Sequence, residues 1–466
     1  MAACIKISKL STWQPLNRLR RPRFSGAKIE TFLFIFQIFF ELFFKKNEKK
    51  IHCVFFLDIY QKKMYFCAFK NKVIGMKDFK FYDRITGWAV FAVAAICYLL
   101  TVEPTASWWD CGEFIATSVK LEVGHPPGAP LWMIIGRVAA LFSPDDAHMA
   151  LAMNVTSALA AAFTSLFLFW SITHLARRIV ENTYYKSDRR GSYSNAQTVA
   201  VLASGVVGAL IYTYCDTAWF SAVEAEVYSM SSLFTAVVFW LILQWEEHAD
   251  EKYANRWLVL ICYLMGLSIG VHLLNLLVIP AIVLVYYYKK YNPTRLGTVL
   301  ALGISVVILA FVLYFIIPQT VNIAAHFDLM FVNGFGLPYY SGIITFLILV
   351  LAGLGWLVWW SHKNGKAIIN LISLGVFVIM IGYGSFAMTV IRSFANTPIN
   401  ENSPSDGFSL LSYLNREQYG DNPLIYGPYF TAEAIGSEKE TTYIPQDGKY
   451  LEINKPAAKY IYDKEN

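Results

Sequence analysis

RITGWAVFAVAAICYLLTV, residues 84–102, decides the fold class. After one arginine it runs without charge for about twenty residues, the length that crosses the hydrocarbon core of a membrane. The chain of 466 residues is 56% hydrophobic and 15% charged, whereas about a quarter of the residues in a soluble domain are charged. We predict an all-α polytopic membrane protein with about nine transmembrane helices, at 84–102, 149–175, 197–214, 228–245, 257–271, 273–288, 297–317, 341–360 and 367–391.

The connections between these spans alternate sharply in charge. Basic residues gather in RRIVENTYYKSDRRG, EEHADEKYANR, KKYNPTR and HKNGK. In segments 103–148, 215–227 and 318–340 the only lysine or arginine residues are Lys120 and Arg137. Because cytoplasmic loops are enriched in Lys and Arg, we expect the first set in the cytoplasm, with a cytoplasmic N-terminus and an outer C-terminus. The net charge of +6 thus reflects topology, and we expect no nucleic-acid partner.

Composition divides the chain into three parts. Residues 1–75 are rich in Lys, Phe and Ile, and their longest apolar burst (31–44) is short for a span. We predict that 1–75 is a non-native or disordered extension and that Met76 is the biological start; a genuine amphipathic leader is the alternative. Residues 76–392 form the predicted membrane domain. Residues 393–466 turn polar and are expected to form an extracytoplasmic segment, possibly truncated.

The first outer loop, 103–148, is too long to be a simple turn. It contains a Gly/Pro corner, GHPPGAP (124–130), in which each proline disfavours helix at the preceding residue. The next run, LWMIIGRVAALF (131–142), is too short to span the membrane and fits a helix lying along the interface.

Ionisable groups collect at the outer ends of the predicted spans and avoid their middles. In WWDCGEF (108–114), Asp110 and Glu113 are spaced i, i+3, so a helix would place both carboxylates on one face. Paired carboxylates suit general-base chemistry. An ordinary solvated helix start, with acids favoured by the helix dipole, explains the pair equally well.

Further polar candidates lie at the same outer ends. Each has a plain structural alternative: a packed loop histidine, a solvated acid, a helix-to-helix hydrogen bond, or an arginine reaching the lipid headgroups. The candidates for binding substrate are His125, Arg137, Glu224, Glu226, His272, Asn275 and Arg392.

Four stretches together resemble a family of membrane glycosyltransferases of the GT-C class that includes bacterial envelope proteins and an animal protein O-mannosyltransferase. They are TVEPTASWWDCGEFIATSVKLEVGHPPGAPLWMIIGRVAALF (101–142), WFSAVEAEVYSMSSLFTAVV (219–238), GLSIGVHLLNLLVIPA (266–281) and NENSPSDGFSLLSYLNREQYGDNPLIYGPYF (400–430). The resemblance covers about 76–430 and implies a GT-C-like bundle. It further implies transfer of a sugar, mannose in the relatives, from a polyprenyl-phosphate carrier to a hydroxyl of a protein or glycan acceptor at the outer face.

In this interpretation Asp110 is the base, with Glu113 as its orienter or an acid that binds the acceptor, although their roles could be exchanged. Arg137, His125, His272 and Arg392 are candidates for the leaving phosphate, with Glu224 and Glu226 for sugar or acceptor hydroxyls. We predict no cofactor and no dedicated metal site, and a divalent cation held by the two carboxylates is the alternative. The expected location is the bacterial inner membrane among membrane lipids. Alternatives are a transporter or flippase for lipid-linked sugars and a non-catalytic envelope assembly subunit.

Overall fold

The structure is a computed structural model that describes residues 73–184, 192–420, 427–429, 431–455 and 459–462. The chain divides into two compact units, Met1–Cys67 and Ala68–Asn466. The predicted extension 1–75 lies outside the described residues except for its last three positions.

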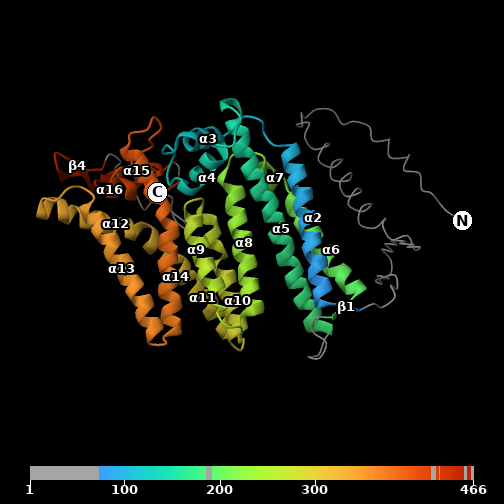
Figure 1. Cartoon of the computed structure of the whole chain (residues 1–466). Helices are drawn as coiled ribbons and strands as arrows, with labels where there is room; N and C mark the ends of the chain where they lie inside the picture. Colours follow the sequence, from blue (N-terminus) through green and yellow to red (C-terminus); the bar gives the residue numbers. More distant parts are fainter. Residues whose placement is uncertain (1–72, 185–191, 421–426, 430, 456–458, 463–466) are drawn as a thin grey trace. The chain divides into compact units, whose positions relative to one another are not determined.

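The second unit is a bundle of long apolar helices (Figure 1). Eight helical stretches among the described residues are long and apolar enough to cross a membrane. The remaining predicted span contains the apolar helix α9 (Arg256–Ile269), which is shorter, with 14 residues. Each of these stretches coincides with one predicted span, which confirms the all-α polytopic fold. The others contain α2 (Met76–Leu100), α5 (Met149–Tyr184), α6 (Asn195–Tyr214), α8 (Val227–His248), α10 (Ile279–Lys290), α11 (Arg295–Phe311), α12 (Ile317–Leu329), α13 (Ser341–Lys363), α14 (Ala367–Tyr383) and α15 (Ala387–Phe394).

Short elements join these helices, and most lie at one end of the bundle. The first long loop forms α3 (Cys111–Lys120), α4 (Pro130–Ala140) and the 3-10 helix η1 (Asp146–His148). The prediction of a short helix after the Gly/Pro corner is therefore confirmed by α4, and its place along the membrane interface stays a prediction. The remaining short elements are β1 (Val73–Gly75), β2 (Ser192–Ser194), α7 (Asp216–Ala222), η2 (Leu273–Val278), η5 (Gly384–Phe386), α16 (Gly407–Leu414) and η6 (Glu417–Tyr419).

Helices α9 and α14 approach each other closely through glycine. A Cβ atom at Gly266 would lie 2.4 Å from the carbonyl oxygen of Ile379, and one at Gly382 would lie 2.5 Å from the backbone nitrogen of Leu267. Both positions therefore exclude a side chain, as expected where two membrane helices pack backbone to backbone. This contact fixes the frame that carries the loop at His272.

The span that begins at Arg295 continues further than predicted. We predicted that it ends at 317 and that 318–340 is an outer loop; instead α11 runs through a π-helical turn, η3 (Val312–Ile316), into α12, and ends in a second such turn, η4 (Met330–Gly334). The cause is the position of Pro318 directly after the wider turn, where its missing N–H and its ring are tolerated. Residues 318–334, which we predicted as an amphipathic outer connection, are therefore helical.

The segment after the last span is anchored to α12. It contains two antiparallel strand pairs, β3 (Ala434–Glu438) with β6 (Lys459–Tyr462) and β4 (Thr441–Gln446) with β5 (Lys449–Asn454). The hydroxyl of Tyr450 donates to the buried Asp328 carboxylate at 2.8 Å, and the same carboxylate accepts from the backbone N–H groups of Tyr340 and Gly342. One buried acid thus holds α12, the start of α13 and the β4–β5 hairpin together.

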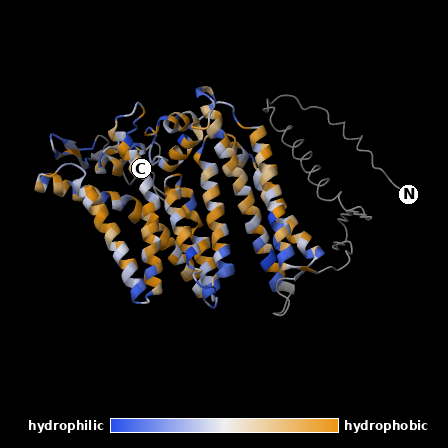
Figure 2. Ribbon diagram, in the orientation of Figure 1, coloured by the Kyte–Doolittle hydropathy of each residue, from blue (hydrophilic) through white to orange (hydrophobic). Residues whose placement is uncertain are grey.

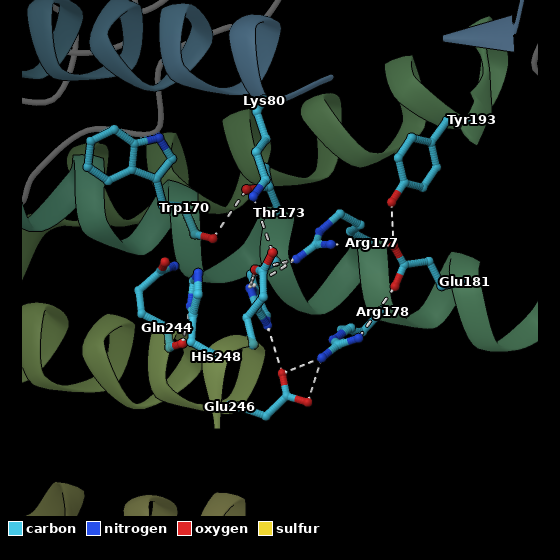
Figure 3. A network of polar contacts seen from close by, with 12 residues as sticks. Lys80, Trp170, Thr173, Arg177, Arg178, Glu181, Tyr193, Gln244, Glu246 and His248 are labelled. Atoms are coloured by element: carbon cyan, nitrogen blue, oxygen red, sulfur yellow. Dashed lines mark hydrogen bonds and ion pairs between the residues drawn. The ribbon is translucent and has the colours of Figure 1, made fainter. Parts of the chain in front are cut away.

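A network of buried and half-buried charges joins α2, α5 and α8 at the other end of the bundle (Figure 3). Arg177 donates to Glu247 at 2.8 Å and to Glu181 at 3.3 Å, and Arg178 donates to Glu246 at 2.6 Å. Tyr193 of β2 donates to Glu181. Charges buried in this way are tolerated because each has an opposite partner. Figure 2 shows the hydrophilic ends and hydrophobic middles of the helices.

Candidate active site

Helix α3 places both predicted acids at its N-terminal end. Asp110 is the residue before the helix, with its side chain 57% exposed, and Glu113 lies in the first turn. Negative charge is favoured there by the helix dipole. Trp108 and Trp109 just before it are more than four-fifths exposed. The acids therefore sit where the chain leaves an exposed aromatic stretch.

Glu113 binds His125 of the Gly/Pro corner. Its Oε1 atom accepts from the backbone N–H of His125 at 2.6 Å and lies 3.0 Å from the ring Nδ1. Burial by itself raises the pKa of Glu113, but the hydrogen bonds from His125 outweigh it and hold the pKa below its usual range. The same hydrogen bond raises the pKa of His125. The imidazole is thereby fixed with its other nitrogen, Nε2, 4.0 Å from Asp110 Oδ2.

The corner is shaped by two glycines and one tyrosine. A Cβ atom at Gly124 would meet Glu113 Oε1 at 2.6 Å. Gly128 has φ +75°, and a Cβ atom there would lie 2.5 Å from the hydroxyl oxygen of Tyr413. That hydroxyl donates to the carbonyl of Gly124 at 2.6 Å. Helix α16, far away in sequence, is thus docked directly on the loop that carries His125.

Two predicted phosphate ligands instead hold the C-terminal end of α3. Arg137 of α4 donates to the carbonyl of Val119 at 2.7 Å. Arg392 of α15 donates to the carbonyls of Leu121 at 2.5 Å and Lys120 at 3.2 Å. Cations suit the last carbonyls of a helix. Both guanidinium groups therefore orient α3 and do not join the acids at its other end.

Glu224 and Glu226 are buried beside the start of α3. Glu226 is 6% exposed and accepts from the Cys111 thiol at 3.7 Å, while Glu224, 4% exposed, accepts from Ser107 at 2.6 Å. Burial, together with the charge of Asp110, raises the pKa of Glu226 to about 7. Burial also raises the pKa of Glu224. The site thus contains one exposed carboxylate and one carboxyl group that titrates near neutrality.

Arg416 supplies a cation on the same side. It follows α16 with φ +57°, and its guanidinium lies 4.6 Å from the centre of the Tyr419 ring. Burial and the positive charge of Arg416 lower the pKa of His272, and its charge also reaches His125. Within the described part of the chain, Arg416 forms no ion pair. It can therefore neutralise an anion placed between the two histidines.

An apolar cluster forms the floor under these groups. It joins α3, α4, α8 and the residue before His272, and its fully or nearly buried members are Phe114, Ala129, Trp132, Met153, Ala225, Val227 and Val271. Glu226 precedes Val227 and His272 follows Val271 in sequence. The ring of His272 lies 5.4 Å from that of Tyr228. The cluster thus fixes the backbone on both sides of the site.

The structure brings six of the nine predicted site residues to one region: Asp110, Glu113, His125, Glu224, Glu226 and His272. Asn275 is fully buried and donates to Ser268 of α9 at 2.8 Å, so it lies in the helix packing, and Arg137 and Arg392 hold α3. Sequence reasoning missed Arg416, although it lies within a segment that carries the family resemblance. No three His, Cys, Asp or Glu side chains of the described segments could hold a metal ion together.

Much of the candidate site lies within a stretch that matches a known protein family. Residues 110–295 match the model of the protein O-mannosyl-transferase TMEM260 N-terminal domain, and so include α3, the corner, Glu226 and His272. The chain resembles the protein O-mannosyl-transferase family. The protein O-mannosyl-transferase TMEM260 of Mus musculus is 25% identical over 181 residues, which cover 39% of this chain and 22% of that protein. The protein O-mannosyl-transferase tmem260 of Dictyostelium discoideum is 23% identical over 202 residues, which cover 41% of this chain and 22% of that protein.

The chain therefore spans less than a quarter of the length of either relative through this match. No solved structure matches it.

Proposed function

We propose that this protein is an integral-membrane glycosyltransferase of the GT-C type. It moves a sugar, mannose, from a polyprenyl-phosphate carrier to a hydroxyl group of a protein acceptor, on Ser or Thr, at the outer face of its membrane. The names of both relatives support the sugar and the reaction class. The basic loops at the opposite end of the bundle support the orientation.

One observation carries the proposal: the exposed Asp110 carboxylate, the oriented His125 imidazole and the Arg416 cation, which pairs with no carboxylate of the described segments, face one region beside membrane-spanning helices. A lipid-linked donor has to be met there, because its phosphate lies at the interface while its tail stays in the membrane. A transporter would instead require ionisable groups and broken helices near the midplane. A purely scaffolding subunit has no need of an oriented imidazole beside a carboxylate.

The proposed reaction begins at the acceptor hydroxyl. Asp110 accepts the hydroxyl proton while the oxygen attacks the anomeric carbon, and the bond from that carbon to the phosphate oxygen breaks, leaving its electron pair on the phosphate. Glu113 acts through His125, whose ring it holds in place. Glu226, which holds a proton at neutral pH more readily than an ordinary glutamate, donates a hydrogen bond to the sugar or the acceptor.

The leaving phosphate requires positive charge or hydrogen-bond donors. His125, with its raised pKa, and Arg416 supply both, and each charge-assisted bond to phosphate strengthens as negative charge develops. Arg416 takes the role that the sequence suggested for Arg137 and Arg392. His272 keeps a place at the edge of this region as a neutral donor or acceptor, because its pKa is lowered.

The decisive experiment measures sugar transfer directly. Purified protein in detergent is incubated with polyprenyl-phosphate mannose and Ser/Thr peptides, and the mannosylated peptide is quantified. We expect Asp110→Asn to lower kcat by about a hundredfold or more, the usual effect of removing a general base. Asp146→Asn, an exposed acid in the same loop, is the matched control and should retain wild-type activity. Equal transfer by Asp110→Asn and wild type would remove Asp110 from the base role.

The role of Arg416 is tested in the same assay. Arg416→Gln should raise KM for the lipid-linked donor and lower kcat together, since a phosphate ligand acts in both the ground state and the transition state. Arg416→Lys should recover part of the activity because it restores the charge without the planar fork. A normal donor KM in Arg416→Gln would exclude the contact.

The membrane that houses the protein is a separate question. The bacterial inner membrane remains our prediction from the resemblance to envelope proteins, while both relatives named above come from eukaryotes. A divalent cation also stays an open partner of the acids. Transfer measured with and without a chelator decides it.

A further inference from the structure

A cavity of about 590 Å³ opens at the end of the bundle farthest from the candidate active site. It lies between the loop that precedes α9 and the turn that joins α13 to α14. Helix α9 begins at this cavity with Arg256 and ends at Ile269, three residues before His272. Fourteen residues of helix span about 21 Å, so the two sites are separate (Figure 1).

The lining of the cavity is polar at its mouth and apolar inside. Arg256, Asn255 and His362 contribute polar side chains, and all three are exposed to solvent. Val259 of α9 and Leu371 and Leu374 of α14 form an apolar wall along the two helices. This order, from charged to apolar along the membrane direction, matches the order of groups in a phospholipid.

The mouth carries positive charge that the described residues do not neutralise. Arg256 lines the cavity and lies 5.7 Å from the centre of the Trp257 ring, whereas Lys363 belongs to the turn beside the cavity and lies 5.1 Å from the centre of the Trp359 ring; neither forms an ion pair with a described carboxylate. Lys366 has no such pair either. The nearby Asp250 is already paired with Lys289 at 3.1 Å and Lys290 at 3.4 Å. The cavity therefore attracts anions.

The start of α14 adds the positive end of a helix dipole to the same place. The helix begins at Ala367, which lines the cavity, and Lys366 before it provides no side-chain cap. The backbone N–H of Ala367 itself donates to the carbonyl of Gly365 at 3.1 Å, so the helix dipole is what favours a negatively charged group at this helix start. The volume also lies within the range of small-molecule sites, about 300–1,000 Å³.

We propose that this cavity binds an anionic phospholipid. Its phosphate contacts Arg256 and the N-terminal end of α14, and one acyl chain runs along Val259, Leu371 and Leu374. The proposal does not depend on the glycosyltransferase activity, because it uses none of the residues of the candidate active site.

Native mass spectrometry of the full chain in detergent tests the proposal. Dioleoyl-phosphatidylglycerol and dioleoyl-phosphatidylcholine are titrated in parallel, and retained lipid is counted. We expect the wild-type protein to retain phosphatidylglycerol more tightly than phosphatidylcholine. The double variant Arg256→Gln/Lys366→Gln should bind phosphatidylglycerol about tenfold more weakly than wild type, which is about the loss expected for a charge-assisted contact. Arg295→Gln, an exposed basic residue at the start of α11 outside the cavity, is the matched control and should bind as wild type. Equal retention of both lipids, or equal losses in all variants, would overturn the proposal.

A second arm distinguishes a lipid from free phosphate. Inorganic phosphate at millimolar concentration should neither displace the retained lipid nor raise the melting temperature, since it lacks the acyl chain that the apolar wall contacts. Displacement of the lipid by phosphate would refute the lipid assignment. Melting temperatures of the variants without added lipid check that they fold, and both should stay close to wild type because the substituted residues are exposed.

Discussion

Replacing Glu226 by glutamine should make the stability of the protein less sensitive to pH. The carboxyl is 6% exposed, and its pKa is raised from the ordinary value of 4.5 to about 7. Below pH 4.5 the carboxyl is protonated in both the folded and the unfolded chain, so it does not change the free energy of unfolding. As pH rises to 7, only the unfolded chain gives up the proton easily, and the folded state loses stability. At about 1.4 kcal/mol per pH unit between pH 4.5 and 7, the free energy of unfolding is lowered by about 3 kcal/mol once the pH is above 7.

The test is thermal unfolding of wild type and Glu226→Gln in detergent from pH 5 to 8.5. Glutamine has the same shape and still accepts a bond from Cys111, so the variant should gain on wild type as pH rises, with the difference levelling off above pH 7. Glu401→Gln, an exposed acid beyond the last span, should show no such trend. A difference that is constant across the pH range, or one that shrinks as pH rises, would refute the reasoning.

Three further substitutions probe the packing, each measured by thermal or denaturant unfolding. Tyr413→Phe removes the donor to the buried Gly124 carbonyl and should cost about 1–2 kcal/mol. Gly128→Ala places a Cβ at φ +75°, against the Tyr413 hydroxyl, and should cost about 1–3 kcal/mol; an unchanged melting temperature would contradict the described corner. Arg177→Ala removes the closest ion-pair partner of Glu247 and one of the two arginine partners of Glu181, and should cost about 3–5 kcal/mol. The exposed Lys80→Ala should cost less than about 1 kcal/mol, and the reverse order would be inconsistent with Figure 3.

The bundle itself could be predicted because its signal is strong and local. Apolar runs of membrane length define each span on their own, and all nine predicted spans have a helix in the structure. The error came at Pro318, where a proline normally ends a helix. A π-helical turn over Val312–Ile316 accommodates it, and hydropathy contains no information about such a turn.

The acids at the site could be located for a similar reason. Asp110, Glu113 and His125 lie within sixteen residues of one loop, so local spacing already favoured their proximity. Their roles could not be assigned in this way. Whether an arginine faces a phosphate or the end of a helix depends on packing between segments far apart in sequence, as Arg392 and α3 demonstrate.

Arg416 was missed because its exposed side chain follows a polar segment that gave no pattern. Only the docking of α16 through Tyr413 brings it beside the two histidines. Asn275 was wrongly expected at the surface of the site, because its spacing from His272 suits a helix. The chain there is a 3-10 helix, Leu273–Val278, which turns the amide toward Ser268.

The short pairing between the Gly/Pro corner and the chain after the last span has a practical consequence. Val123 donates to the carbonyl of Ile399 at 3.0 Å and accepts from Glu401 at the same distance. A protease that cut between Arg392 and Tyr413 would leave every transmembrane helix and every carboxylate of the site intact. It would nevertheless free the corner on one side, and Arg416 would then be held in place only by the noncovalent contacts of α16 and of the β4–β5 hairpin. Inactive preparations of normal size in the membrane should therefore be checked for a nick at this position.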